Sequence, residues 1–295
     1  MGITIENFLN YLQFELNRSA LTVSSYGDDL HAFEAYFKAK DIELSWESID
    51  SDVIRDWMES MMDKGNSATS INRRLSALRS FYRYALVRNL VSKDPVRGIT
   101  GPKRSKPLPQ FLREAEMDRL LDDIPRGETY KEVRDYTIIM MFYETGMRLG
   151  ELIGLDDAHV DFDNKQVKVT GKGNKQRIIP FADELFGVLQ NYLQLRNQEV
   201  ACKSAAFFLT DKGERMTRSG VRYIVKKGLS KVSTLKKRSP HVLRHTFATA
   251  MLNNSAGLES VKKLLGHESL STTEIYTHTT FEQLKKVYED AHPRA

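Results

Sequence analysis

The stretch HVLRHTFATAMLNNSAGLESVKKLLGHESLSTTEIYTH, residues 241–278, holds most of what this sequence says about its fold and its chemistry. Its apolar residues recur at helical spacing, and Pro240 stands where a first helix can begin, because proline is favoured in the first turn. The pattern predicts helices over 242–254, 258–265 and 272–276. The end of the chain is therefore expected to be helical.

Side chains capable of chemistry stand near the ends of these predicted helices. His241 and Arg244 are three residues apart and therefore share one helix face. His267 directly follows Gly266, a residue that stops helices, and Tyr276 lies on the short third helix. Taken singly, such a histidine is more often a hydrogen-bonding partner of a helix end, and such a tyrosine is more often a core residue. Only the group as a whole indicates a site.

A metal site is the first alternative for this group. His241 and His245 are four residues apart, which is the spacing of a metal-binding pair. The glutamate of the HExxH zinc motif is missing, and no third ligand is evident. We therefore expect no metal here.

An arginine and a glutamate form a second motif. In TGMRLGEL, residues 145–152, Glu151 follows Arg148 by three residues, close enough on a helical turn to orient the guanidinium. An ordinary surface ion pair is the alternative when this motif is taken alone.

A glycine-bearing turn is the third motif. Apolar residues alternate on both sides of TGKGNKQ within residues 165–181, which predicts a β-hairpin with Lys172 at its tip and Lys175 and Arg177 nearby. A solvated turn is the alternative. A phosphate-binding loop of the nucleotide triphosphatases is excluded, because that loop needs a longer glycine spacing and leads into a helix.

The first hundred residues predict a separate helical domain. Residues 1–63 hold 4 basic and 13 acidic residues, a net charge of −9, whereas residues 64–106 hold 11 basic and 1 acidic, a net charge of +10. The basic segment includes a predicted helix with an apolar stripe and five arginines: Arg73, Arg74, Arg79, Arg83 and Arg88. Contact with phosphates and a merely solvated helix face are both open interpretations.

Prolines mark a boundary after this helix. DPVRGITGPKRSKPLP, residues 94–109, contains four of them, and proline removes backbone donors and restricts its predecessor. The expected division is a helical domain over 1–100, a linker over 101–110 and a second domain over 111–295.

Composition narrows the class of protein. A chain of 295 residues with 41% hydrophobic and 28% charged residues is ordinary globular protein of about two domains, not a disordered chain, a collagen or a coiled coil. Cys202 is the single cysteine, so an internal disulfide is impossible and a reducing compartment is expected. The amino terminus has neither the basic segment nor the apolar run of a signal peptide or membrane helix.

Six residues, in order and with their flanking words, resemble the tyrosine recombinase family, and most closely its Xer subgroup: Arg148, Lys172, His241, Arg244, His267 and Tyr276. LTVSSYGDDLHAF and TSINRRLSALRSFYRYA in the first domain are similar to the family's core-binding domain, so the resemblance covers nearly the whole chain. It implies a mainly α fold with a small β-sheet or hairpin in the catalytic domain. The two domains, a helical SAM-like core-binding domain and the catalytic domain, would form a C-shaped clamp on DNA.

The resemblance also implies a role for each residue in cutting and rejoining DNA through a 3′-phosphotyrosyl intermediate. Tyr276 would be the nucleophile and His241 the base that takes its proton, while Lys172 would protonate the leaving 5′-oxygen. The remaining roles are binding of the phosphate by Arg148 and Arg244, a hydrogen bond from His267 to the transition state, and orientation of Arg148 by Glu151.

Partners follow from the same resemblance. Double-stranded DNA with inverted-repeat half-sites would be held by two sets of residues, Arg73, Arg74, Arg79, Lys103 and Arg104 in the first half and Lys175 and Arg177 on the hairpin. A homotetramer, or a heteromer with a paralogous recombinase, would assemble on two DNA sites, with the last helix near 281–290 docked on a neighbouring subunit. No metal or cofactor is expected, and the location would be cytoplasmic and nucleoid-associated.

Other functions stay open at this point. Chromosome dimer resolution is the expected biological role, and integration or transposition of a mobile element is the alternative. A second enzymatic alternative is a type IB topoisomerase, which uses a similar pocket without exchanging strands. An alternative from a different class is a DNA-binding protein that has lost catalysis.

Overall fold

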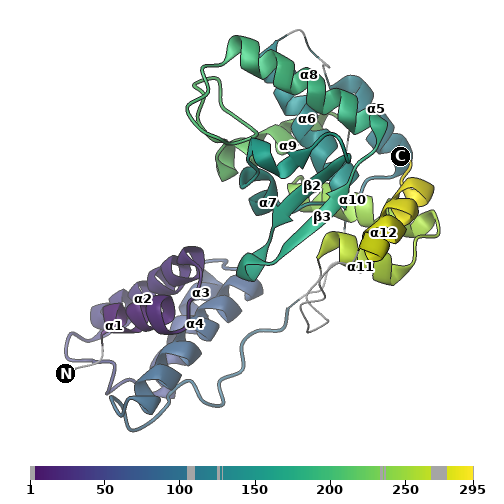
Figure 1. Ribbon diagram of the computed structural model, residues 1–295. Helices are drawn as coiled ribbons and strands as arrows, with labels where there is room; N and C mark the ends of the chain where they lie inside the picture. The colour runs from purple at the N-terminus through teal and green to yellow at the C-terminus, as the bar shows by residue number, and fades with distance from the viewer. Residues whose placement is uncertain are drawn as a thin grey trace. The chain divides into compact units, whose positions relative to one another are not determined.

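The computed structural model describes residues 4–104, 110–124, 127, 129–232, 235, 237–266 and 278–294 (Figure 1). The chain divides into two compact units, Met1–Pro107 and Leu108–Ala295. It is mainly α-helical with one small β-sheet, as the sequence predicted. Among the described residues, we find no helix with the length and apolar character needed to cross a membrane.

The described part of the first unit contains helices and no strand. They are α1 (Ile5–Asn10), a π-helical turn (Tyr11–Glu15), α2 (Ala20–Lys40), α3 (Ser51–Asp63) and α4 (Ala68–Val87). Side chains that accept bonds from the first free backbone amides begin the four α-helices, namely Thr4, Ser19, Asp50 and Ser67. Capping residues in the sequence therefore set where these helices begin.

Aromatic rings make up much of the core of this unit. Trp46 lies 4.5 Å from Phe81 and 5.2 Å from Phe37 between ring centroids, and Phe33 lies 4.7 Å from Trp57. The rings meet at tilted or edge-to-face angles, which suit their quadrupoles. They join the helices to the segment that connects α2 and α3.

The second unit is organised around one buried helix, α6 (Tyr130–Thr145). It is buried on almost every side, because nearly all of its residues over Tyr136–Tyr143 are apolar. Its neighbours are α8 (Asp183–Glu199), α9 (Arg218–Val232) and α10 (Pro240–Asn253), with α5 (Glu114–Asp123) packed on α9.

The predicted hairpin is present and belongs to a three-stranded antiparallel sheet. Its strands, in the order β1-β2-β3, are β1 (Val160–Asp161), β2 (Gln166–Thr170) and β3 (Gln176–Pro180). Val167 pairs with Ile179 and Val169 with Arg177, so these side chains share the buried face of the sheet. The hairpin thereby turns Arg177 toward the interior.

Three helices close the chain. Besides α10 they are α11 (Leu258–Leu265) and α12 (His278–Ala291), which lie against one another at the carboxyl end in Figure 1. Leu284 and Tyr288 of α12 are buried together with Phe247 and Leu264 of its own unit. These two residues of the last helix therefore pack within their own chain, and docking of the helix on a neighbouring subunit stays a prediction.

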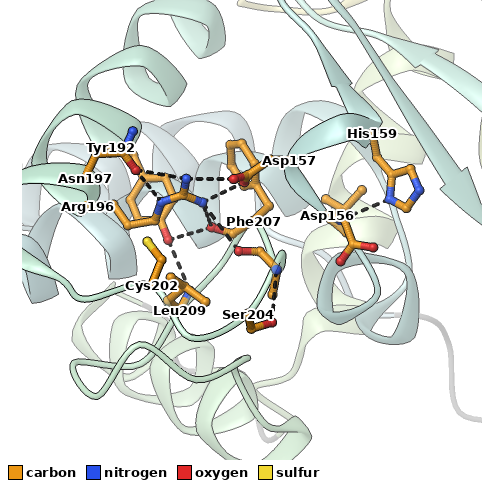
Figure 2. Close-up of polar contacts among 12 residues, drawn as sticks. Asp156, Asp157, His159, Tyr192, Arg196, Asn197, Cys202, Ser204, Phe207 and Leu209 are labelled. Carbon is orange, nitrogen blue, oxygen red and sulfur yellow. Dashed lines mark hydrogen bonds and ion pairs between the residues drawn. The ribbon is translucent and has the colours of Figure 1, made fainter.

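A buried arginine anchors the irregular segment between α8 and α9. Arg196 donates two bonds to the Asp157 carboxylate, at 2.7 and 2.9 Å, and a further bond to the carbonyl of Phe207 at 2.9 Å (Figure 2). The segment is therefore held by an ion pair between the buried Arg196 and the exposed Asp157.

Candidate active site

The site begins where α6 ends. Gly146 closes that helix in the left-handed conformation (φ 58°), and Arg148 caps the next helix, α7 (Leu149–Ile153). The backbone amide of Arg148 donates to Glu151 Oε2 at 2.7 Å, and its Nη1 donates to Glu151 Oε1 at 3.0 Å. Glu151 is buried, so this is not the surface ion pair that the spacing alone would usually indicate.

Arg177 binds the same carboxylate from the opposite side. Its Nη1 and Nη2 donate to Oε1 and Oε2 of Glu151 at 2.7 and 2.9 Å. Burial raises the pKa of the Glu151 carboxyl, but the bonds and charges of Arg177 and Arg148 outweigh burial and hold that pKa below its usual value. The prediction that Arg177 contacts DNA is therefore wrong, because its side chain is only 6% exposed and its donors are used inside the protein.

Three consecutive carbonyls at the end of α11 accept bonds from three arginines. Arg177 Nε donates to the carbonyl of Leu264 at 2.7 Å, Arg244 Nη2 to that of Leu265 at 2.7 Å, and Arg148 Nη2 to that of Gly266 at 2.8 Å. These carbonyls have no partner within the helix and carry the negative end of its dipole. The end of α11 therefore brings Arg148 and Arg244 together.

Arg244 is held from two sides. Its Nη1 donates to the carbonyl of Gly146 at 2.6 Å, opposite the bond to Leu265. Burial, followed by the charges of Arg148 and Arg177, lowers the pKa of the Arg244 guanidinium to about 10. The group still carries its charge at neutral pH, and with three guanidiniums around one carboxylate the cluster has an excess of positive charge.

His241 lies beside these charges. Desolvation, followed by the fields of His245, Arg244, Arg222 and Arg148, lowers the pKa of the His241 imidazole. The imidazole is therefore neutral at neutral pH and can accept a proton. The residue is exposed, one turn before Arg244 on α10.

The remaining members of the predicted set are placed less fully. Lys172 begins the turn between β2 and β3, and its side chain lies outside the described part of the structure. His267 and Tyr276 also lie outside the described residues. Lys175 is exposed on the same turn.

Three of the predicted DNA contacts on α4 are used within the first unit. Arg73 pairs with the buried Asp29 and with Ser25, Arg74 donates to the sulfur of Met61, and Arg79 donates to the carbonyl of Ile99 at 2.7 Å. These bonds connect α4 to α2, α3 and the following segment. The structure thus gives the three arginines a packing role that the sequence analysis did not foresee.

Exposed positive charge lies elsewhere in the described residues. Lys103 and Arg104 are exposed, and their contact with phosphates stays a prediction. A second basic surface, which was not predicted from the sequence, is the exposed face of α9. The helix contains no acidic residue, and its exposed basic residues are Arg218, Arg222, Lys226, Lys227 and Lys231. The recurrence of basic residues every four positions from 218 to 226 is the signal that could have identified it.

This basic face of α9 borders the arginine cluster. A Cβ atom on Gly150, two residues after Arg148, would lie 3.2 Å from Arg218 Nη2, and the charge of Arg222 acts on His241. The face and the cluster thus form one positively charged region of the second unit.

Within the described residues, no group of three or more His, Cys, Asp or Glu side chains could hold a metal ion. The described site offers two held guanidiniums, a neutral imidazole and a positive field. Such a field suits a group that becomes more negative as it reacts.

Comparison with known proteins places this geometry in a family. Residues 110–283 match the phage integrase family, and residues 5–89 match the phage integrase N-terminal SAM-like domain. Tyrosine recombinase XerC of Pelotomaculum thermopropionicum is 39% identical over 305 residues, covering 100% of this chain and 99% of the relative. Tyrosine recombinase XerC of Staphylococcus aureus (strain JH9) is 38% identical over 291 residues, covering 98% and 96%.

Solved structures are similar over nearly the same length. The pre-cleavage complex of the XerH site-specific recombinase bound to difH substrate has a TM-score of 0.68 and 25% identity, covering 96% of this chain and 82% of that one. The post-cleavage complex of XerH with palindromic difH has a TM-score of 0.71 and 24% identity over the same shares, which supports the fold.

Proposed function

This chain belongs to the phage integrase family and is a Xer-type tyrosine site-specific recombinase, and on that premise we propose how its residues divide the chemistry. Residues 1–100 form the core-binding domain, 101–110 the linker and 111–295 the catalytic domain. Double-stranded DNA is the substrate, and the reaction is transesterification at a phosphodiester.

Arg148 and Arg244 bind the scissile phosphate. The observation that carries this assignment is that both guanidiniums rest on adjacent carbonyls, Gly266 and Leu265, at the end of one helix. Attack on a phosphodiester increases the negative charge on its non-bridging oxygens. Arginine suits this charge because it stays protonated at neutral pH and because its planar guanidinium can bind two oxygens at once. Glu151 orients Arg148 through the two bonds described above.

Tyr276 is the nucleophile. Its phenolic oxygen attacks phosphorus, its proton passes to the neutral His241 imidazole, and the bond from phosphorus to the 5′-oxygen breaks. Lys172 on the hairpin turn donates a proton to that 5′-oxygen as it leaves. His267 donates a hydrogen bond to the phosphoryl oxygens.

The product of this step is a 3′-phosphotyrosyl link that preserves the energy of the original ester. A second 5′-hydroxyl can therefore attack the link and reseal a strand without ATP, a metal or another cofactor. This is why the proposed roles need only protein side chains.

Binding and biology follow from the relatives. We infer that the exposed basic residues Lys103, Arg104 and Lys175, with Arg222 and Lys226 of α9, contact phosphates of two inverted-repeat half-sites. A homotetramer, or a heteromer with a paralogous recombinase, holds two such sites in the cytoplasm at the nucleoid. The relatives named tyrosine recombinase XerC support recombination of the Xer type, and we propose chromosome dimer resolution as its biological role.

A nicked suicide substrate tests the proposed chemistry. A nick close to the scissile phosphate lets the short 5′-hydroxyl strand diffuse away, so the covalent protein–DNA adduct accumulates and can be counted on a denaturing gel. The wild-type protein is expected to form the adduct with or without EDTA, and Tyr276→Phe is expected to bind the same DNA without forming it.

Three results would contradict the proposal. They are the absence of any adduct from wild-type protein on DNA that it binds, an adduct from Tyr276→Phe, and loss of the adduct when EDTA is added.

A further inference from the structure

Arg177 has no part in the chemistry proposed above, although all three nitrogens of its guanidinium donate hydrogen bonds within the site. Two of its bonds go to the Glu151 carboxylate and one to the Leu264 carbonyl. A planar guanidinium that uses its fork and its Nε together is fixed in both position and orientation. The side chain therefore connects strand β3, helix α7 and the end of helix α11.

The carboxylate of Glu151 is shared evenly between two arginines. Each of its oxygens accepts one bond from Arg177 and one from Arg148. The carboxylate is buried, and a buried carboxylate that loses one cationic partner tends to take up a proton. Without Arg177, Glu151 would thus hold Arg148 less firmly.

The other bond of Arg177 acts on both phosphate-binding arginines. Leu264 immediately precedes the two residues whose carbonyls accept bonds from Arg244 and Arg148. Holding the Leu264 carbonyl fixes the last turn of α11 and so the two neighbouring carbonyls. A displacement of about 1 Å in such a group can lower a rate about 100-fold.

We propose that Arg177 is a positioning residue for strand cleavage, which fixes Arg148 through Glu151 and fixes both phosphate-binding arginines through the end of α11, without contacting DNA. This inference rests on the proposed function, because it requires Arg148 and Arg244 to hold the scissile phosphate.

Two substitutions and a matched control test it. Arg177→Gln removes the charge and the fork, and Arg177→Lys keeps the charge but loses the fork. Arg196→Gln is the control, because Arg196 is equally buried in the same unit and makes the same kind of twofold bond to a carboxylate, that of Asp157 (Figure 2). The readouts are the single-turnover rate of adduct formation at saturating suicide DNA, the Kd for DNA, and the fraction of folded protein.

The expected result separates rate from binding. Arg177→Gln should lower the rate per folded molecule about 100-fold while the Kd stays within about threefold of wild type. Arg177→Lys should recover part of the rate. Arg196→Gln should reduce the folded fraction and leave the rate per folded molecule unchanged.

A pH series adds a readout that a purely structural role would not change. The charged groups that act on Glu151 are Arg177 on β3, Arg148 at the start of α7 and Arg244 on α10. Removal of Arg177 leaves burial as the main influence on the Glu151 carboxyl, so the rate of Arg177→Gln divided by that of wild type should fall as the pH is lowered. Adding Glu151→Gln should abolish that pH dependence, while the shared ionisation of His241 cancels in the ratio.

The outcomes are distinct. If wild type forms the adduct and both Arg177 variants match its rate per folded molecule, the positioning role is overturned and the proposed function stands. The positioning role is also overturned if the total rate of adduct formation of the Arg177 variants falls only as much as their folded fraction falls, which is the result expected for Arg196→Gln. If wild type forms no adduct, the proposed function fails and the positioning role fails with it.

Discussion

Gly266 decides the geometry of charged side chains around it. Its backbone is in the left-handed conformation (φ 64°), which ends α11 and aims its carbonyl at Arg148. A Cβ atom at this position would lie 3.1 Å from Arg177 Nη1 and 3.2 Å from its Cδ. The residue must therefore be glycine for a conformational reason and for a steric one.

Gly266→Ala is expected to reduce both stability and cleavage. The left-handed conformation costs a residue with a Cβ about 1 kcal/mol, and the added methyl group would push Arg177 from Glu151. We expect a lower Tm and a rate of adduct formation reduced at least about tenfold, measured on the suicide substrate.

Gly257→Ala is the matched control at the other end of α11. Gly257 has an ordinary φ of −60°, and the nearest atom to an added Cβ is Ser260 Oγ at 4.0 Å. This variant should behave as wild type. Equal losses in the two variants would show that the helix tolerates no alanine at either end and would contradict the role given to Gly266.

At the scale of elements, α12 is attached to α6 by a buried polar group. The hydroxyl of Tyr288 donates to Glu144 Oε2 at 3.2 Å, and the Tyr288 ring stacks on His292 with 5.1 Å between centroids. Burial, together with the charge of Glu184, raises the pKa of the Glu144 carboxyl to about 8, and burial lowers the pKa of His292 to about 4. Both groups are therefore held neutral in the folded protein.

Glu144 makes the stability of the second unit depend on pH. Because its folded pKa is raised, the folded state binds more protons than the unfolded state between the ordinary carboxyl pKa and about 8. The contribution of the neutral carboxyl is complete below that window and is lost as the pH rises through it. His292 acts in the opposite sense, because its contribution is complete above its ordinary pKa and is lost as the pH falls toward about 4.

Glu144→Gln isolates the first effect. Glutamine stays neutral at every pH, so the Tm of the variant minus that of wild type should increase from pH 5 to pH 9, measured by thermal unfolding in buffers of matched ionic strength. Glu199→Gln is the control, because it removes an exposed carboxyl of the same unit that is not among the influences on the Glu144 pKa. A difference that stays constant across this range would contradict a neutral Glu144.

At the scale of the whole molecule, acidic and basic residues are concentrated in different segments of the sequence, but these segments do not correspond to the two units. The first unit contains both the acidic residues 1–63 and the basic residues 64–106. The acidic part supplies Asp29 to Arg73 and Glu15 to Arg88, so some of the positive charge of α4 is neutralised internally. The charge available to DNA is therefore smaller than the net +10 of the basic segment suggests.

The substitution Arg104→Gln tests whether the exposed charge of Arg104 contributes to DNA binding. Each phosphate contact releases counterions, so losing one should reduce the slope of log K against log salt by about 1. Lys38→Gln is the control, because it removes an exposed positive charge from the acidic segment. Fluorescence anisotropy with labelled half-site DNA between 50 and 200 mM salt gives both slopes, and equal slopes for Arg104→Gln and wild type would exclude Arg104 from the interface.

Local structure could be predicted well from the sequence. The helix expected over 258–265 has the same bounds in α11, and the hairpin lies where alternating apolar residues placed it. Helix and strand periods are set by neighbours in the chain and by a single buried stripe or face, and both are visible in the residue order. The order of the six family residues likewise identified the class of reaction.

Only the tertiary structure decided whether each arginine is paired inside the protein or exposed to solvent. Arg177 meets Glu151 across 26 residues and Leu264 across 87, and Arg73 meets Asp29 across 44, so no local pattern separates them from arginines that face DNA. The attachment of α12 to its own unit depends in the same way on Glu144, 144 residues earlier. The sequence by itself determined the elements and the chemical groups, because these depend on near neighbours. The tertiary structure decided which groups are free to act, because burial and pairing depend on residues far apart in the chain.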